Sequence, residues 1–462
     1  MFIPTTEKEK QEMLRTIGVR DFRDLFRNLP QNILYPKLKL PPRLTELELT
    51  REVEKQAARH PALLSFLGGG AYDHFIPAAV WVLAMRGEFV TAYTPYQAEA
   101  SQGTLQAIYE FQSLICDLFS MDVCNASMYD GASSLAEAVL MALRHTGRNR
   151  VLYPRSLHPH SLQTVKTYLS ELKEVELVEI PCPQGVLDLE ALKKHLDNRV
   201  AAVVVQHPNF FGALEPMNEL GDLVHGVGAL LVASVNPASL GILSPPGEWG
   251  TVGAVPFPTV PGESTKVPMG PQGADIAVAE GQPLGLPLEY GGPYLGIMTC
   301  KESLLRKIPG RLCGMTVDRD GRRGFVLTLQ AREQHIRREK ATSNICTNEA
   351  LCALAATIYM ALLGPQGMRE LGELNVQVAH DLAERLSKKK GYGLWFKSPF
   401  FNEFVLKTPI PAAQVQEKLL KKGILPGLPL GTFYPEMKNA LLVCATETKT
   451  EEDLDNLIRA LP

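Results

Sequence analysis

Two apolar runs decide the fold class: Ala201-Ala202-Val203-Val204-Val205-Gln206 and Ala229-Leu230-Leu231-Val232-Ala233-Ser234-Val235. Each has the length of a strand, and a helix-length segment separates them. Four further runs show the same alternation, at Val151 to Tyr153, Val175 to Ile180, Ala274 to Val278 and Leu295 to Thr299. Apolar strands that alternate with helices indicate βαβ units, in which helices cover both faces of a mostly parallel sheet. We therefore predict a large α/β domain over residues 71–330.

Different patterns flank this domain on both sides. Over residues 1–70 the apolar residues recur three and four apart between charges, and prolines separate the segments, which predicts a helical N-terminal arm. Over residues 331–462 a helical connection leads into alternating helices and strands, which predicts a small α+β C-terminal domain. Thr450, with Asp453 three residues later, is the predicted N-cap of the last helix.

One segment, residues 251–273 (TVGAVPFPTVPGESTKVPMGPQG), stands apart. It is rich in proline and glycine and predicts neither a helix nor a strand by periodicity. Such a composition predicts a long loop. We interpret it as an insertion into the large domain that extends outward.

The composition excludes several classes of function. The 462 residues are 45% hydrophobic and 21% charged, which is typical of a globular protein with a large core. A net charge of −3, with Lys and Arg spread along the chain, indicates no nucleic-acid binding. The longest apolar stretch, roughly Phe75 to Met85, is far shorter than the ~20 residues that cross a bilayer. The first ten residues show no signal peptide, so we expect a cytoplasmic protein.

The cysteines predict no metal site. The eight of them include no C-x-x-C pair and none with a histidine at zinc-ligand spacing. We therefore expect reduced, mostly buried thiols.

A helix start rich in Gly and Ser is the first candidate binding motif. The sequence Tyr129-Asp130-Gly131-Ala132-Ser133 has the form of a turn whose backbone N–H groups hold a phosphate at a helix N-terminus. Its candidate contacts are Tyr129, Gly131 and Ser133. An N-capped helix start without any ligand explains the motif equally well.

The large α/β domain, the small C-terminal domain and the N-terminal arm together resemble the aspartate-aminotransferase-like family of pyridoxal-phosphate enzymes, fold type I. Such enzymes need a Schiff-base lysine and a carboxylate at a strand end. Here the strand over 229–235 offers Ser234 and Asn236 and no Asp. The only lysine between Lys194 and Lys301 is Lys266, in the Pro/Gly-rich segment, where a solvated loop lysine is expected. A self-sufficient enzyme that uses Lys266 is the first alternative.

Four motifs make the resemblance specific. They are Ala92 to Gly103 (AYTPYQAEASQG), Tyr129-Asp130-Gly131, Gly281 to Pro293 (GQPLGLPLEYGGP) and Arg332 to Asn344 (REQHIRREKATSN). Together they resemble the α-type first subunits in the P-protein family of the glycine cleavage system, over nearly the whole chain.

The resemblance implies a split enzyme. In that family the second, β-type subunit carries the lysine that binds pyridoxal phosphate, and Gln282 and Pro283 would replace the partner's His-Lys pair in this chain. This chain would then hold no cofactor covalently and would complete the partner's site in an α2β2 assembly. The assembled glycine decarboxylase would act on glycine and pass the aminomethyl group to the lipoyl group of the H-protein. A purely structural subunit is the second alternative.

Two segments hold the residues that we expect to reach the shared site or the partner. On the loop that enters a helix, the shared-site candidates are Tyr93, Thr94, Tyr96, Gln97, Glu99 and Ser101. In the charged run, the partner or anion contacts are Arg337, Arg338, Lys340, Thr342, Ser343 and Asn344. A polar helix-capping loop and an ordinary exposed helix are the alternatives. We expect His335 to form structural hydrogen bonds rather than to act as a general base.

Overall fold

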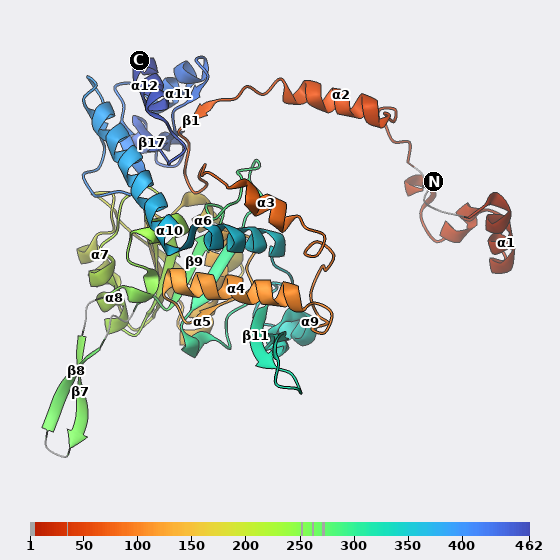
Figure 1. The fold of residues 1–462 in the computed structure, drawn as a ribbon, viewed down its shortest axis with the longest axis horizontal. Coiled ribbons are helices and arrows are strands. Elements are labelled where there is room, and N and C mark those ends of the chain that lie inside the picture. The colour runs from red at the N-terminus through yellow and green to blue at the C-terminus, as the bar shows by residue number, and fades with distance from the viewer. Residues whose placement is uncertain (1–4, 35, 251–252, 261–262, 270–272) are drawn as a thin grey trace. The chain divides into compact units, whose positions relative to one another are not determined.

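The computed structural model describes residues 5–34, 36–250, 253–260, 263–269 and 273–462 (Figure 1). They belong to two compact units, Met1–Ala62 and Leu63–Pro462. The first unit covers most of the arm predicted for residues 1–70.

The first unit is helical and has almost no core. Its elements are α1 (Glu7–Ile17), the 3-10 helices η1 (Phe22–Phe26) and η2 (Gln31–Ile33), and α2 (Glu46–Ala57). The hydroxyls of Thr6 and Thr45 cap the two α-helices, each as part of a capping box. Leu14 is the only buried side chain among the residues described in this unit. Helices of this length gain most of their stability from tertiary packing, so this unit has the character of a segment that packs on another surface.

The second unit is built around a seven-stranded sheet in the order β2-β10-β9-β6-β5-β3-β4. Its strands are β2 (Val123–Cys124), β3 (Arg150–Pro154), β4 (Glu176–Ile180), β5 (Val200–His207), β6 (Leu230–Val235), β9 (Ile276–Glu280) and β10 (Gly296–Cys300). The pairs from β4 to β9 are parallel, whereas β10 pairs antiparallel with β9 and with β2. All six predicted strand runs lie in this sheet. The predicted α/β class with a mostly parallel sheet is confirmed.

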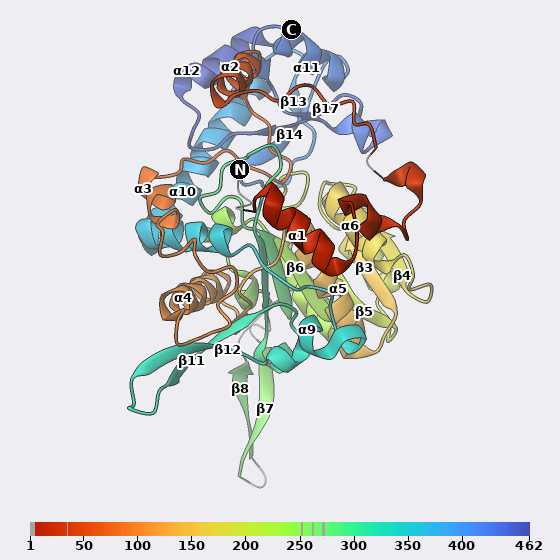
Figure 2. The ribbon, with the colours of Figure 1, turned by 90° about the vertical axis from the view of Figure 1, so that its right-hand side faces the viewer.

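Helices cover both faces of the sheet (Figure 2). They are α4 (Gln102–Phe119), α5 (Gly131–Thr146), α6 (Pro159–Leu169), α7 (Leu189–His195) and α8 (Met217–Gly226). Alternate residues of β5 serve the two faces, as a pleated strand requires. Val203 and Val205 belong to one core with α4 and α8, whereas Ala202 and Val204 belong to another with α5 and α6. Burial on both faces explains why the strands read as continuous apolar runs.

A kinked helix connects the sheet to the C-terminal part of the chain. Helix α10 (Ala350–Ser387) is interrupted at Gly364, which has a φ of 61° and precedes Pro365. Its length and composition would suffice to cross a membrane, but 44% of its most apolar window is buried in the protein. Its first half packs in the core beside α3 (Ala78–Ala84), as expected for the core helix of a globular protein.

The C-terminal part has its own antiparallel sheet, in the order β13-β14-β17-β16 (Figure 2). Its strands and helices are β13 (Gly393–Leu394), β14 (Glu403–Lys407), α11 (Ala412–Leu420), β16 (Leu428–Pro429), β17 (Ala440–Cys444) and α12 (Glu451–Ala460). The short strands β1 (Leu64–Ser65) and β15 (Ile424–Leu425) pair in parallel. Thr450 and Asp453 form the capping box of α12, so this predicted N-cap is confirmed.

Two hairpins leave the main sheet. One consists of β11 (Leu312–Val317) and β12 (Arg323–Thr328). The other consists of β7 (Gly253–Val260) and β8 (Glu263–Met269), and over these residues it corrects the prediction of a long loop at 251–273. Proline is tolerated at edge strands, and both strands of a two-stranded hairpin are edges. Lys266 lies in β8, and its side chain falls outside the described residues.

A candidate active-site cavity and two outer segments

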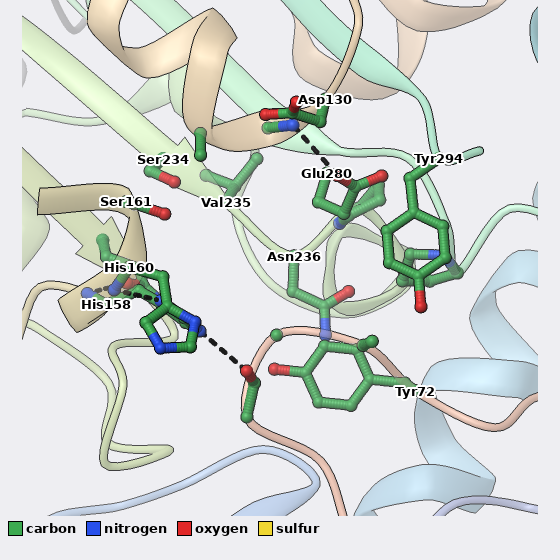
Figure 3. A pocket seen from close by; sticks show the side chains of 18 of the residues that line it. Tyr72, Asp130, His158, His160, Ser161, Ser234, Val235, Asn236, Glu280 and Tyr294 are labelled. Atoms are coloured by element: carbon green, nitrogen blue, oxygen red, sulfur yellow. Dashed lines mark hydrogen bonds between the residues drawn. The ribbon is translucent and has the colours of Figure 1, made fainter. Parts of the chain in front are cut away.

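A cavity of about 620 Å³ lies where the carboxyl ends of the parallel strands meet the start of α5 (Figure 3). Residues at or just beyond the ends of β5, β6 and β9 form one part of its wall. The starts of α5 and α6 and the loop at residues 69–72 form the rest. Open α/β sheets bind ligands at this place, because loops and helix N-termini converge there. The cavity is therefore the candidate active site of this fold.

Gln282 ties the cavity wall together just after β9. Its Oε1 accepts a hydrogen bond from the Tyr72 N–H at 2.7 Å, and its Nε2 donates to the carbonyls of Tyr72 and Leu286, both at 2.8 Å. The side chain is 1% exposed, and Pro283 beside it lines the cavity. No lysine is among the described residues that line the cavity. Gln282 thus acts as a structural clamp between this turn and the loop at Tyr72.

The start of α5 is closed by carboxylates. The Gly131 N–H donates to Glu280 Oε2 at 2.9 Å, and Asp130 caps the Ser133 N–H at 2.7 Å. Glu280 Oε1 also accepts from the N–H groups of Gln282 and Leu295. A Cβ on Gly131 would lie 2.8 Å from the Glu280 backbone nitrogen, so only glycine permits this approach. Burial raises the pKa of Glu280 to about 7.

Two of the three predicted phosphate contacts line the cavity, and the third is buried away from it. Tyr129 and Gly131 line the cavity, whereas Ser133 is 5% exposed and is engaged with Asp130. The Tyr129 hydroxyl accepts a hydrogen bond from the Cys346 N–H at 3.3 Å. The N–H groups of Gly131 and Ser133 already have carboxylate partners, which provide the negative charge that a helix N-terminus favours.

The β6 end and the start of α6 complete the cavity (Figure 3). Ser234 and Asn236 line it, and Asn236 Oδ1 accepts from the Ala238 N–H at 3.0 Å, so its amide caps the next turn. His158 Nε2 lies 2.7 Å from the Gly69 carbonyl, and its Nδ1 accepts from the His160 N–H. These contacts together require the proton on Nε2. Burial lowers the pKa of His158, which favours the neutral ring.

The residues predicted for the shared site lie away from this cavity. Tyr93 is 89% exposed and Tyr96 is 52% exposed, on the loop that leads into α4. Gln97 and Glu99 are exposed, and Ser101 is half-buried at the N-cap of α4. The Thr94 hydroxyl is buried and has no hydrogen-bond partner among the described residues. None of the six lines the 620 Å³ cavity.

The charged run forms α9 (Gln334–Arg337), the 3-10 helix η7 (Arg338–Lys340) and an irregular stretch after it. Four of its six predicted contact residues line a second hollow together with Glu137: Arg338, Thr342, Ser343 and Asn344. Arg337 and Lys340 are exposed and lie outside that hollow. The ring of His335 lies 5.9 Å from the ring of Tyr96, so the two predicted segments meet at this point.

Comparisons with known proteins match the whole chain. The family model for the glycine cleavage system P-protein matches residues 1–256 and 265–461. The chain is 49% identical over 464 residues to a probable glycine dehydrogenase (decarboxylating) subunit 1 of Desulfitobacterium hafniense, covering 100% of this chain and 99% of the relative. A protein of the same name from Moorella thermoacetica is 49% identical over 461 residues, covering 100% and 98%.

The chain belongs to the glycine cleavage system P-protein family. A crystal structure of glycine decarboxylase (P-protein) in inhibitor-bound form matches with a TM-score of 0.87 and 44% identity, covering 100% of this chain and 99% of that one. A Burkholderia pseudomallei sphingosine-1-phosphate lyase matches with a TM-score of 0.63 and 15% identity, covering 92% of both chains, which shows the fold alone. The resemblance to P-proteins and to fold type I is confirmed. The unmatched residues 257–264 lie within the predicted insertion.

The P-protein fold implicates pyridoxal phosphate in the enzyme, but the cavity of this chain does not fit it. Gln282 stands beside the cavity and no described lining residue is a lysine. Asp130, Glu280 and Glu349 line the cavity without any Lys or Arg among its described lining residues, and carboxylates already cap the α5 start. Cations or several free N–H groups hold a phosphate, whereas this lining places carboxylates beside the α5 start and has no Lys or Arg among its described residues.

Three functional candidates were missed from the sequence: Glu280, His158 and Arg311. Glu280 ends an apolar strand, and His158 precedes a proline at a helix start, but neither pattern alone indicates a site. Arg311 lies directly before β11 and is 4% exposed. An arginine next to an apolar strand was the available signal, because a buried guanidinium requires partners.

Proposed function

We propose that this chain is the subunit of a two-part glycine decarboxylase that carries no Schiff-base lysine. One observation carries the proposal: at the place where the fold binds its cofactor, Gln282 serves as a clamp and Glu280 occupies the N–H of Gly131. Because these side chains are engaged in hydrogen bonds within the fold, they stabilise the cavity wall, and another subunit would supply the catalytic groups.

The partner is proposed from the names of the relatives. Proteins called subunit 1 are similar to this chain over its full length, and such a name supports a second, β-type subunit. That partner would hold pyridoxal phosphate covalently, in an α2β2 complex in the cytoplasm. The complex would decarboxylate glycine and transfer the aminomethyl group to the lipoyl group of the H-protein.

The share of this chain in the reaction would come from two outer segments, residues 93–101 before α4 and residues 337–344 from the end of α9 onward. Tyr93, Tyr96, Gln97 and Glu99 are exposed or half-exposed polar residues that do not line the cavity of this chain. They would contact the substrate or cofactor in the partner's site, where they would orient reacting groups and exclude water. Arg337 and Lys340, also exposed, would contact the partner or its anions.

The proposal is tested by the absorbance spectrum of the purified chain with pyridoxal phosphate, before and after borohydride reduction. We expect no covalent label on the chain alone, and glycine decarboxylation only after mixing with the lysine-bearing partner. Labelling of the isolated chain at Lys266, abolished in Lys266→Ala, would instead establish a self-sufficient enzyme. Turnover of the mixed complex that does not change on substitution of Tyr93, Tyr96 or Glu99 would establish a purely structural subunit.

A further inference from the structure

Arg311 is a buried charge at the junction of the two outer segments. It lies directly before β11 and is 4% exposed. Its guanidinium contacts Tyr96 of the first segment on one side and residues 346–348, just after the second segment, on the other. It therefore joins the loop before α4 to the chain that follows α9.

The partners of Arg311 in the described chain are neutral. Its Nη1 donates to Asn348 Oδ1 at 2.9 Å and to Thr347 Oγ1 at 3.3 Å, and its Nη2 donates to the Cys346 carbonyl at 2.7 Å. Its Nε is buried without a hydrogen-bond partner among the described residues. The five N–H groups of a guanidinium suit a carboxylate or phosphate, and no described residue supplies one here.

Arg150 is an arginine of the same chain whose charge is offset by carboxylates. Arg150, whose side chain is 11% exposed, pairs with Glu176 and Asp197, both at 2.8 Å. A positive charge that is removed from water is costly unless an anion offsets it. Because Arg311 lacks that anion within the described chain, its charge remains available to an anion from outside.

Tyr96 is the route from this buried charge to the surface. Its hydroxyl lies 3.5 Å from Arg311 Nη2, and the guanidinium carbon lies 5.8 Å from the centre of its ring. A hydroxyl that accepts from a guanidinium keeps its own proton for donation, and the neighbouring charge strengthens that donation. No described residue accepts this proton, and Tyr96 is 52% exposed. His335, the other ring beside Tyr96, is itself 3.6 Å from the Glu333 carboxylate.

We propose that Arg311 provides the positive charge with which this chain recognises an oxyanion in the shared site, acting as a positioning residue through the Tyr96 hydroxyl. This rests on the proposed function, because the oxyanion belongs to the partner's site. It is either the carboxylate of glycine or the phosphate of pyridoxal phosphate. The hydrogen bond from Tyr96 binds the oxyanion, and the charge of Arg311 strengthens it.

The test uses the complex of the full chain with its partner subunit. Arg311→Gln removes the charge, and Arg311→Lys keeps it without the fork of N–H groups. One arm compares the Kd of glycine with that of methylamine, which has no carboxylate, from the absorbance change of the loaded complex. The other arm compares the Kd of pyridoxal phosphate with that of pyridoxal, which has no phosphate, by equilibrium dialysis against the cofactor-free complex.

We expect Arg311→Gln to weaken one oxyanion ligand about tenfold or more, while its counterpart without the oxyanion changes less than about twofold. The arm that responds identifies the oxyanion. Arg311→Lys is expected to keep the affinity within about threefold, because the charge remains. The control is Arg148→Gln, which removes another arginine with neutral partners, the carbonyls of Val200 and Val227, and should leave every Kd unchanged.

The proposal is overturned if Arg311→Gln leaves both oxyanion ligands within about twofold, if it weakens each counterpart equally, or if Arg311→Lys is equally damaging. If Arg311→Gln prevents assembly, Tyr96→Phe decides. A loss of about threefold or more for one oxyanion ligand alone supports the proposal, and unchanged affinities overturn it. Failure of the proposed function shows separately, because the wild-type complex would then not form or would not acquire activity on mixing.

Discussion

The cavity and the outer segments differ in whether their buried polar groups are hydrogen-bonded. At the cavity, Glu280 accepts three N–H groups and Gln282 makes three hydrogen bonds to backbone. In the first outer segment the Thr94 hydroxyl, and at the junction of the two segments Arg311 Nε, are buried without partners among the described residues. Native proteins satisfy buried polar groups unless a function or a missing partner explains the exception. The difference shows that the polar groups of the cavity wall are satisfied within this chain, whereas two buried polar atoms at the outer segments are not satisfied by the described residues.

The largest expected effect is a loss of stability in Gln282→Leu, which removes the hydrogen bonds of Gln282 at the cavity wall. This change leaves the N–H and carbonyl of Tyr72 and the carbonyl of Leu286 without their partner in a buried place. Each unsatisfied group costs ~1–3 kcal/mol, so we expect the free energy of unfolding to fall by about 4 kcal/mol. Urea denaturation of the isolated chain measures it.

The control for Gln282→Leu is Gln163→Leu, which changes an exposed residue on α6. It should alter the free energy of unfolding by less than about 0.5 kcal/mol. If Gln282→Leu is equally mild, the cavity wall is not a closed network and the comparison between the two regions fails.

The next effect is the pH dependence of stability caused by Glu280. Its folded pKa of about 7 lies above its ordinary value of 4.5, so the folded state holds an extra proton between these values. The contribution of this carboxyl to the free energy of unfolding is therefore fully present below pH 4.5, falls as the pH rises from 4.5 to 7, and does not change above pH 7. Glu280→Gln removes this loss, so we expect its stability relative to wild type to rise by about 3 kcal/mol across the window.

Denaturation of both proteins at several pH values between 4 and 8 measures this difference. Glu403, also buried and with its pKa raised to about 7, titrates in both proteins and cancels. Glu417→Gln, on the exposed side of α11, is the matched control and should show no such rise. A pH-independent difference between Glu280→Gln and wild type would contradict a buried, desolvated carboxylate at the α5 start.

The strands of the main sheet were easier to predict from the sequence than the hairpin of β7 and β8. The strand runs of the sheet were predictable because burial on both faces demands continuous apolar residues, as in β5. The hairpin of β7 and β8 was missed because proline and glycine outweighed a weak alternation, at Val255, Phe257 and Thr259, that is typical of a strand. Composition is a poor guide where both strands are edges.

The roles of Glu280 and Arg311 were beyond reach for another reason. Glu280 meets the Gly131 N–H across 149 positions of sequence, and Arg311 meets Tyr96 across 215. Local patterns carry no information about such contacts, because the tertiary fold creates them. In contrast, the outer segments could be named from the sequence because their polar motifs are contiguous in the chain, and their role in a shared site stays a prediction.

A smaller effect, on glycine turnover of the complex, is expected from Tyr93→Ala in the first outer segment. Because Tyr93 is 89% exposed, the isolated chain should keep its free energy of unfolding within about 0.5 kcal/mol. In the assembled enzyme we expect glycine turnover to fall about tenfold, because the side chain would contact the shared site. Turnover measured on the complex, beside denaturation of the isolated chain, separates the two. Tyr290→Ala, at an equally exposed tyrosine outside the two segments, is the control, and equal turnover in both variants would favour a purely structural subunit.

The smallest effect is expected from Thr94→Val, and it tests the comparison most directly. Valine has nearly the shape of threonine but no hydroxyl, so it removes a buried polar atom that has no partner in the described chain. Burying such a group costs ~1 kcal/mol or more, so the isolated chain should become more stable by about 1 kcal/mol. If the hydroxyl gains its partner on assembly, the same variant should bind the partner subunit more weakly, by about fivefold in Kd. We therefore expect Thr94→Val to raise the free energy of unfolding of the isolated chain and to weaken binding of the partner subunit. A hydroxyl that is already hydrogen-bonded within the chain would give the opposite result for stability, because its loss would lower the free energy of unfolding.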